Sequence, residues 1–155
     1  MIKIQTDKVP NEKDKYETIL YYNNIEATVF NYYLRDKNYS SSQTEKKYPN
    51  GLFVDGGAFT MKDFRNKKLL TILLYETFLS IPDDICLQFA VQNRKLIPFY
   101  DRLGFKKVQK IDYWGKVSNT KNFELEKLTV KIKKKISDEL NKILNDKGYK
   151  IEKRI

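Results

Sequence analysis

Alternating apolar and polar positions in the first third of the chain predict a sheet. The alternation is clear in Met1–Gln5, and Tyr16–Tyr22 and Glu26–Leu34 are rich in the β-branched and aromatic residues that strands favour. Two consecutive asparagines between the last two stretches are typical of a hairpin turn. Arg35–Asn50 carries six charges and three consecutive serines without periodicity, so we expect a loop there.

The middle of the chain alternates between strand and helix patterns. Gly51–Met61 is a strand candidate, and the Gly-Gly pair in its middle indicates a bulge or a close approach of another backbone. Apolar residues then recur at helical spacing from Leu69 to Phe78, until Pro82 ends the pattern. Ile85–Val91 is almost continuously apolar, as expected for a strand that is covered on both faces.

The last third predicts a short helix, two strands and a longer helix. The short helix, about Lys95–Leu103, precedes a glycine that suits a left-handed helix end. Lys106–Trp114 and Asn122–Leu128 alternate as strands do. A stripe of isoleucines and leucines from Ile132 to Leu144 then indicates an amphipathic helix. The chain has no internal repeat and no long linker, which predicts one domain of the α/β (α+β) class.

Composition narrows the chemistry that such a domain can carry. The 155 residues suit a single domain, 1–155, and 41% apolar residues suffice for a core. The absence of histidine and the single cysteine exclude an internal disulfide framework, the usual zinc sites, and Ser-His-Asp or Cys-His catalysis. No apolar run approaches the roughly 18 residues of a membrane span, and the N-terminus lacks a signal-peptide pattern. We therefore expect a soluble, cytoplasmic protein without a membrane partner.

The formal charge of +10 is concentrated toward the C-terminus. Met1–Phe105 has 15 basic and 13 acidic residues, a net charge of +2, whereas Lys106–Ile155 has 15 basic and 7 acidic residues, a net charge of +8. Such an excess attracts an anionic partner or only keeps a Lys-rich surface solvated. We favour the solvated surface.

One stretch suggests a phosphate site. Phe59–Leu74 predicts a strand, a basic turn and a helix whose N-terminus faces the turn. Unpaired backbone N–H groups and the positive end of the helix dipole suit a phosphate at such a junction, and Arg65, Lys67 and Lys68 add three cations. On its own, however, the stretch is better explained as an ordinary helix entry with solvated charges.

A second stretch changes that interpretation. After the predicted strand Ile85–Val91, the chain reads Asn-Arg-Lys-Leu-Ile-Pro-Phe-Tyr-Asp-Arg-Leu-Gly-Phe. This resembles the C-terminal signature N-x-x-x-x-x-F-Y-x-x-x-G-F of the GCN5-related N-acetyltransferases. The matching positions are Asn93, Phe99, Tyr100, Gly104 and Phe105.

The resemblance assigns a role to the basic turn. The acetyl-CoA loop of that family has the pattern [QR]-x-x-G-x-[GA] at the start of the helix after the fourth strand. Here it falls on Arg65, Asn66, Lys67, Lys68, Leu69 and Leu70. Lys68 and Leu70 replace the two small residues that let a backbone approach the pyrophosphate closely, so the loop is degenerate. Backbone N–H groups still bind phosphate there if no positive φ is needed.

The resemblance spans about Leu52–Leu128. The hairpin Tyr16–Leu34 is similar to the second and third strands of that family, which implies a central mixed, mostly antiparallel sheet with flanking helices. The family normally places two helices between the first strand and this hairpin, but Thr6–Asp14 has hardly room for one. We expect residues 129–155 to form an extra C-terminal helical extension beyond this fold.

The resemblance also implies a cofactor and a reaction. Acetyl-CoA would be the cofactor, and a primary amine of a small molecule, peptide or protein would be the acceptor. Backbone N–H groups near Phe59, Thr60 and Met61 would polarise the thioester carbonyl. Asn93 would hydrogen-bond the pantetheine arm, and Tyr100 would protonate the coenzyme A thiolate.

The general base must be a carboxylate or a water, because the chain has no histidine. Asp55, just before the Gly-Gly pair of the predicted fourth strand, is the first candidate, and Glu26 on the hairpin is the second. Each is equally explained as a solvent-facing strand residue. Cys86 lies in a buried strand with no base beside it, so we expect a small core residue and not a nucleophile.

Two other classes of function stay open. The net charge of +8 beyond Phe105 and the two replaced glycines fit a nucleic-acid-associated protein with the same fold, which either acetylates an aminoacyl-tRNA-type amine or only binds. The third hypothesis is a homodimer formed through the helix Thr129–Lys147. Its apolar stripe is better explained by packing on the sheet of its own chain.

Overall fold

The chain divides into two compact units in the computed structural model, which describes residues 1–41, 46–91, 97–108 and 121–154. The first unit contains Met1–Tyr33, Gly56–Ile81 and Lys133–Ile155, and the second contains Leu34–Asp55 and Pro82–Ile132. The helices are η1 (Lys62–Phe64), α1 (Leu69–Ser80), α2 (Ile97–Leu103) and α3 (Val130–Lys147). The strands are β1 (Ile2–Lys8), β2 (Lys15–Tyr22), β3 (Ile25–Arg35), β4 (Tyr39–Ser40), β5 (Lys47–Tyr48), β6 (Leu52–Thr60), β7 (Cys86–Val91), β8 (Lys106–Val108), β9 (Lys121–Leu125) and β10 (Ile151–Arg154).

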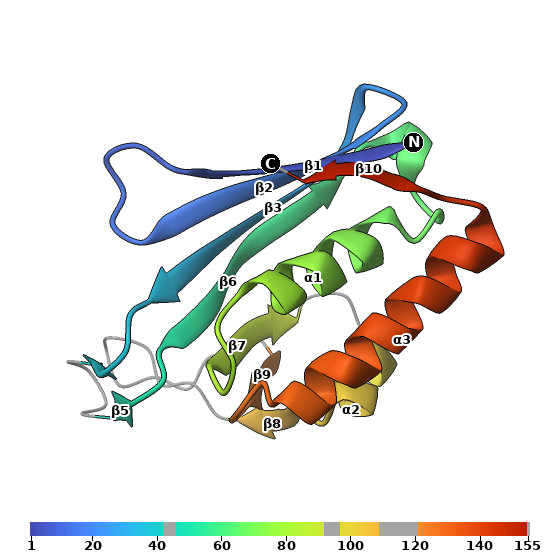
Figure 1. Ribbon diagram of the computed structural model, residues 1–155. Helices are drawn as coiled ribbons and strands as arrows, with labels where there is room; N and C mark the ends of the chain where they lie inside the picture. The colour runs from blue at the N-terminus through green and yellow to red at the C-terminus, as the bar shows by residue number, and fades with distance from the viewer. Residues whose placement is uncertain (42–45, 92–96, 109–120, 155) are drawn as a thin grey trace. The chain divides into compact units, whose positions relative to one another are not determined.

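The first unit is built on antiparallel β1, β2 and β3, with β10 parallel to β1 (Figure 1). Asn23 and Asn24 both have positive φ, 48° and 67°, as a tight hairpin turn between β2 and β3 requires. The predicted hairpin is therefore confirmed. Strands β1 and β2 also pair directly along their whole length, and no helix lies between them.

Helix α1 is buried around most of its circumference. Its buried side chains are Leu69, Ile72, Leu73, Leu74, Tyr75, Thr77 and Phe78. An all-round apolar helix must be covered on more than one side. Helix α3 lies alongside α1 (Figure 1), buries Ile136 and Leu140, and accepts a hydrogen bond from the Tyr75 hydroxyl at the Glu139 carboxylate. The apolar stripe of α3 is thus used within its own unit.

Polar contacts also join α1 to α3. The Lys133 ammonium donates to the carbonyl of Ile81, the C-cap residue of α1. A cation at this end of a helix interacts favourably with the helix dipole. Lys133 begins the run of three lysines in the basic C-terminal third, so one of these charges has a role inside the fold.

The second unit is built on β7, β9 and β8, which pair antiparallel, and on the start of β6, which pairs parallel with β7. Helix α2 buries Phe99, Tyr100 and Leu103. It ends at Gly104 with φ 91°, and Phe105 N–H donates to the Tyr100 carbonyl at 3.1 Å. This is the left-handed helix end that the sequence predicts.

Neighbouring strands follow the order β10-β1-β2-β3-β6 in the first unit and β6-β7-β9-β8 in the second, so β6 contributes to both. The fold class predicted from the sequence is confirmed: α/β (α+β), with a mixed, mostly antiparallel sheet, flanking helices and an extra C-terminal helix. The single domain 1–155 stays a prediction. No helix in the described ranges is long and apolar enough to cross a membrane.

Three expectations about individual elements need correction or lie outside the described residues. The stretch Arg35–Asn50 was expected to be irregular, but it contains the short antiparallel pair β4–β5. Residues 129–155 were expected to be a helical extension, but α3 ends at Lys147 and Ile151–Arg154 form strand β10, which extends the sheet beyond β1. Only Lys106–Val108 of the predicted strand Lys106–Trp114 is described, and it is extended as β8.

Candidate functional site

The basic turn between β6 and α1 has left-handed backbone at two residues without a glycine. Asn66 has φ 64°, and Lys68, the N-cap residue of α1, has φ 60° and ψ 19°. Asparagine tolerates this region, whereas lysine rarely adopts it. The turn therefore does need positive φ, and Asn66 and Lys68 supply it without glycine, so the N–H groups at the start of α1 keep their place at the cost of strain at Lys68. Lys68 adopts the conformation for which the acetyl-CoA loops of the family use glycine.

The N-terminus of α1 leaves hydrogen-bond donors available. The Lys68 side chain makes no capping hydrogen bond, and the first intrahelical bond runs from Ile72 N–H to the Lys68 carbonyl at 3.0 Å. The N–H groups of Leu69, Leu70 and Thr71 precede that bond and have no partner within the helix. Together with the positive end of the helix dipole, they are suited to an anion.

Arg65 is held at the end of β6. Its Nε donates to the Thr60 carbonyl at 3.2 Å, and its guanidinium lies 6.0 Å from the centroid of the Phe59 ring. The Phe59 side chain is 55% exposed. These two contacts orient the guanidinium beside the turn while leaving the other N–H donors of Arg65 for a ligand.

Tyr149 contacts the same turn from the C-terminal segment. Its hydroxyl donates to the Lys67 carbonyl at 3.2 Å, and its ring packs edge-on against Tyr22 at 5.6 Å. Tyr22 in turn packs against Phe64 of η1 at 6.1 Å. Partial burial raises the pKa of Tyr149, so the hydroxyl keeps its proton at neutral pH and donates. The turn is thereby braced by aromatic residues on three sequence segments.

The end of β6 uses part of its backbone in hydrogen bonds to β3. Met61 N–H donates to the Ala27 carbonyl at 2.9 Å, and the Thr28 hydroxyl donates to the Phe59 carbonyl at 3.1 Å. Successive N–H groups along a strand alternate in direction. The Met61 N–H is therefore committed to β3, and the Thr60 N–H is directed away from β3.

Gly56 and Gly57 meet the expectation of an irregular β6. A Cβ at Gly56 would lie 3.0 Å from the Asn31 carbonyl oxygen, so the backbone of β3 approaches here more closely than nearly all side chains tolerate. Gly57 has φ 107°, which side chains rarely adopt. Among the described residues, the pairing of β6 with β7 ends at Val54 and Gln88, directly before Asp55.

The second unit holds Tyr100 and Asp55, the two candidate catalytic residues. Tyr100 is 3% exposed, and its ring lies 5.1–6.1 Å from the rings of Phe89, Phe99, Phe105 and Phe123. Burial in this aromatic cluster raises the pKa of Tyr100, and the negative charge of half-buried Asp55 raises it further. The hydroxyl is therefore protonated at neutral pH.

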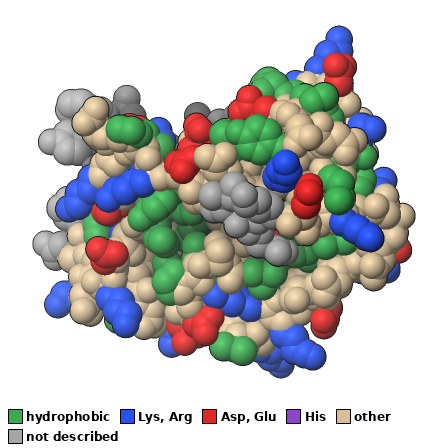
Figure 2. Space-filling model, turned by 45° about the horizontal axis from the view of Figure 1, so that its top comes forward, with side chains coloured by type: hydrophobic (Ala, Val, Ile, Leu, Met, Phe, Trp, Pro, Cys, Tyr) green, Lys and Arg blue, Asp and Glu red, His purple; other side chains and the backbone are tan. Residues whose placement is uncertain are grey.

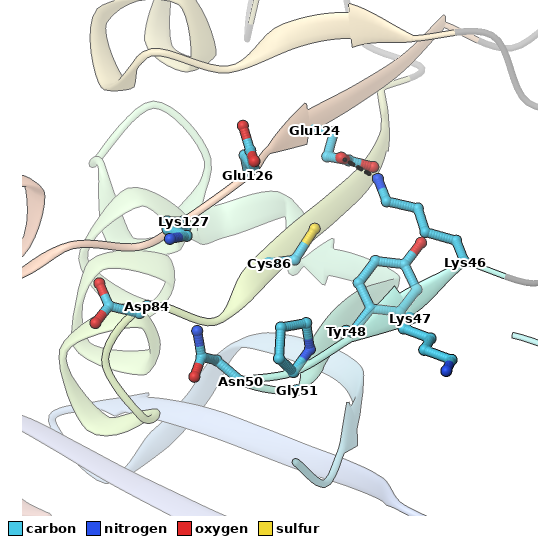
Figure 3. Close-up of a pocket in the computed structure, with 11 residues that line it drawn as sticks. Lys46, Lys47, Tyr48, Asn50, Gly51, Asp84, Cys86, Glu124, Glu126 and Lys127 are labelled. Atoms are coloured by element: carbon cyan, nitrogen blue, oxygen red, sulfur yellow. Dashed lines mark hydrogen bonds and ion pairs between the residues drawn. The ribbon is translucent and has the colours of Figure 1, made fainter. Parts of the chain in front are cut away.

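A pocket of about 130 Å³ lies on the other face of the β6–β7 pair in the second unit (Figure 3). Its lining residues include Tyr48, Gly51, Cys86, Glu124 and Glu126. Alternation along β7 places Cys86 and Gln88 on one face, and Leu87 and Phe89, which packs against Tyr100, on the other. Burial and the nearby Glu124 raise the pKa of Cys86 to about 12, consistent with an unreactive core thiol.

Two further site residues were expected from the sequence, Asn93 and Glu26. Asn93 lies outside the described residues. Glu26, the second candidate base, is an exposed residue of β3. Tyr149 and the Glu124 pocket were not found from the sequence, because the contacts that define them join residues 36 to 82 positions apart.

No known protein family and no curated protein matches the chain by sequence. Similarity is found to solved structures. An uncharacterized protein from Bacillus halodurans superposes with a TM-score of 0.56 at 13% identity, covering 87% of this chain and 68% of that chain. An aminoglycoside N(6′)-acetyltransferase from Legionella pneumophila superposes with a TM-score of 0.53 at 19% identity, covering 80% and 69%. A CoA-dependent acyl-homoserine lactone synthase, BjaI, superposes with a TM-score of 0.50 at 10% identity, covering 92% and 70%.

At these identities the similarity concerns the fold. It agrees with the signature from Asn93 to Phe105 and with the strand–turn–helix order of β6 and α1. The resemblance predicted from the sequence is thus confirmed at the level of the fold: the chain has the fold of the GCN5-related N-acetyltransferase superfamily.

Proposed function

We propose that this protein is an acetyl-CoA-dependent N-acetyltransferase that acts on a primary amine. The observation that carries the proposal is the N-terminus of α1: it follows β6, begins with left-handed Lys68, and lacks a side-chain cap. The fold supports the same assignment. Two of the similar structures are an aminoglycoside N(6′)-acetyltransferase and a CoA-dependent acyl-homoserine lactone synthase.

The turn from Arg65 to Leu70 fits a pyrophosphate. The N–H groups of Leu69, Leu70 and Thr71 would donate to phosphate oxygens, and the Arg65 guanidinium would add charge-assisted hydrogen bonds. Asn66 and Lys67 would form the wall of this binding site, and Asn93 would hydrogen-bond the pantetheine arm. Acetyl-CoA, when bound, supplies the thioester electrophile.

The backbone of β6 would hold the thioester carbonyl. Of the three residues expected at this position, Phe59 and Met61 have backbone groups engaged with β3, whereas the Thr60 N–H is directed away from β3. We therefore assign the Thr60 N–H as the hydrogen-bond donor to the carbonyl oxygen. Phe59 and Met61 would line the cofactor.

Asp55 and Tyr100 would move the protons. The Asp55 carboxylate would accept the proton from the acceptor nitrogen, and the Tyr100 hydroxyl would give its proton to the leaving sulfur. The role of acid requires a protonated hydroxyl, and burial together with the charge of Asp55 raises the pKa of Tyr100 so that it is protonated at neutral pH. The small exposure of Tyr100 would also keep water from competing for that proton.

Nothing in the described part of the chain favours the alternative of nucleic-acid binding. On the face shown in Figure 2, Lys and Arg side chains lie scattered among Asp and Glu side chains and do not form one basic patch. The Lys133 ammonium donates a hydrogen bond to the Ile81 carbonyl at the C-terminal end of α1. Acetyl transfer is therefore the single function that we propose, and nucleic-acid binding stays a prediction from charge alone.

Isothermal titration with acetyl-CoA tests the proposal. We expect binding by the wild-type protein, and about fivefold to thirtyfold weaker binding by Arg65→Gln, because a charge-assisted hydrogen bond is worth about 1–2 kcal/mol. The matched control is Lys142→Gln, which removes the same charge from an exposed position of α3. No detectable binding at millimolar acetyl-CoA, or equal effects of both substitutions, would contradict the proposal.

A further inference from the structure

A threonine hydroxyl is buried in the first unit where β3 passes the end of β6. Thr28 of β3 has an exposed fraction of 0%. Strands β3 and β6 lie side by side (Figure 1). Valine has the same shape as threonine and would fill this position without the cost of removing a hydroxyl from water. The hydroxyl of Thr28 is therefore the part of the side chain that needs a physical reason.

Thr28 donates its only hydroxyl proton to the backbone of β6. The acceptor is the Phe59 carbonyl, at 3.1 Å. The Thr60 hydroxyl lies 3.0 Å from the same Thr28 oxygen. Because a threonine hydroxyl has one proton and two acceptor lone pairs, both contacts are hydrogen bonds only when Thr60 donates to Thr28. The hydrogen bonds thus run from the Thr60 hydroxyl through the Thr28 hydroxyl to the Phe59 carbonyl.

The Phe59 carbonyl belongs to the same peptide unit as the Thr60 N–H. This peptide bond is trans, and the C=O and N–H bonds of a planar trans peptide point in opposite directions. A hydroxyl that fixes the carbonyl toward β3 therefore also fixes the N–H in the direction away from β3. The hydrogen bond that the carbonyl accepts also polarises the peptide, which strengthens its N–H as a donor.

The next peptide unit along β6, from Thr60 to Met61, is held separately. Its N–H donates to the Ala27 carbonyl at 2.9 Å, and its carbonyl accepts from Arg65 Nε at 3.2 Å. Two successive peptides at the end of β6 are therefore held by different groups. The side chain of Thr28 acts on the first peptide, and its hydroxyl can be removed without removing either contact of the second.

We propose that Thr28 is a positioning residue for acetyl transfer: its hydroxyl holds the Phe59–Thr60 peptide so that the Thr60 N–H meets the thioester carbonyl of acetyl-CoA. This inference rests on the proposed function and adds a fully buried residue that acts through the backbone of the neighbouring strand. A preorganised donor stabilises an oxyanion because it needs no reorientation during the reaction. Threonine suits this task, since its branched Cβ restricts the rotation that would move the hydroxyl.

Infrared difference spectra of bound acetyl-CoA, labelled with ¹³C at the thioester carbonyl, test the inference. A hydrogen bond to a carbonyl lowers its stretching frequency. Thr28→Val keeps the shape of the side chain and removes the hydroxyl, so the band of the bound carbonyl should shift to higher frequency. Thr28→Ser keeps the donor, and its band should stay at the wild-type position. Acetyl-CoA affinity by calorimetry should change less than about threefold in both variants, because the phosphate contacts at the turn persist.

Thr18→Val is the matched control. Thr18 is 1% exposed on β2, which is one strand further from β6, and its hydroxyl accepts a hydrogen bond from the Thr6 hydroxyl at 2.9 Å. This substitution also removes a buried hydroxyl from the sheet, but the carbonyl band should stay at the wild-type position. Equal shifts in Thr18→Val and Thr28→Val would overturn the inference, because they would reflect a general loosening of the sheet.

The outcomes separate the inference from the proposed function. An unmoved band in Thr28→Val, with acetyl-CoA still bound, would overturn the role of Thr28 and leave acetyl transfer standing. Absence of acetyl-CoA binding by the wild-type protein would contradict the proposed function, and the role of Thr28 would fall with it. Thr28→Cys is the second variant if Thr28→Val does not fold. A thiol is a weaker donor than a hydroxyl, so its band should shift in the same direction by less, and an unmoved band would again overturn the inference.

Discussion

The left-handed conformation of Lys68 has a measurable cost. A residue with a Cβ loses about 1–2 kcal/mol in this region, whereas glycine adopts it freely. Glycine loses about 0.5–1 kcal/mol more conformational entropy on folding. Lys68 has φ 60° and ψ 19°. Because the strain exceeds the entropy cost of glycine, we expect Lys68→Gly to raise the free energy of unfolding by about 0.5–1 kcal/mol. The gain is aided by the tolerance of helix N-caps for glycine.

Urea unfolding at fixed pH measures this difference. For a chain of 155 residues, the same stabilisation raises the melting temperature by about 1–4 °C. Lys67→Gly is the matched control, because it removes the same charge from the neighbouring position, where φ is not positive. It should lower the free energy of unfolding by about 0.5–1 kcal/mol through backbone entropy alone.

The two variants should thus change stability in opposite directions. If Lys68→Gly destabilises the protein as much as Lys67→Gly does, the turn does not hold Lys68 in the left-handed region. The approach of the α1 N-terminus to a pyrophosphate would then lose its structural basis, because that approach depends on the same backbone conformation.

Three further substitutions and one pH series extend these tests. Tyr149→Phe keeps the ring contact with Tyr22 but removes the hydrogen bond to the turn, so amide exchange of residues 65–71 should accelerate about fivefold by mass spectrometry; unchanged exchange would show that the bond does not brace the turn. Tyr100→Phe should lower turnover about a hundredfold and leave acetyl-CoA affinity unchanged; equal turnover would rule out Tyr100 as the acid. Burial raises the pKa of Cys86 to about 12, so the folded protein should resist iodoacetamide at pH 8 and react only when unfolded. Because the unfolded thiol loses its proton first, near pH 9, stability should fall as the pH rises from about 9 toward 12, and Cys86→Ala should flatten the early part of this fall in urea midpoints.

Elements with local signals could be predicted from the sequence. The paired asparagines, the apolar repeat of α1 and the glycines after α2 and α3 each act through the backbone of a few neighbouring residues. The structure places the corresponding turn and helix ends where these signals predict them, at Asn23, Gly104 and Gly148. Boundaries of this kind depend on φ preferences and periodicity, which a single sequence contains.

Elements stabilised by distant partners could not be predicted in this way. Strand β10 is four residues long and is extended because it pairs with β1 at the opposite end of the chain. The pair β4–β5 is two residues long on each side. The left-handed Lys68 contradicts the local preference of lysine, and contacts such as that between Tyr149 and the Lys67 carbonyl hold the turn from outside. Tertiary contacts outweigh local propensity at these positions.

The C-terminal segment explains how the fold dispenses with helices between its first two strands. Enzymes with this fold normally have two helices there, but here β1 and β2 pair directly, and the cover for α1 comes from the other end of the chain. Glu139 of α3 accepts a hydrogen bond from the Tyr75 hydroxyl, and Lys133 caps the end of α1. The residues after α3 bring Tyr149 to the basic turn between β6 and α1, and β10 to β1. The lysines of α3 are therefore carried by a helix whose apolar side is needed to bury α1. The helix carries six lysines and three carboxylates, a net charge of +3, so its exposed side accounts for part of the +8 of the last third without a nucleic acid.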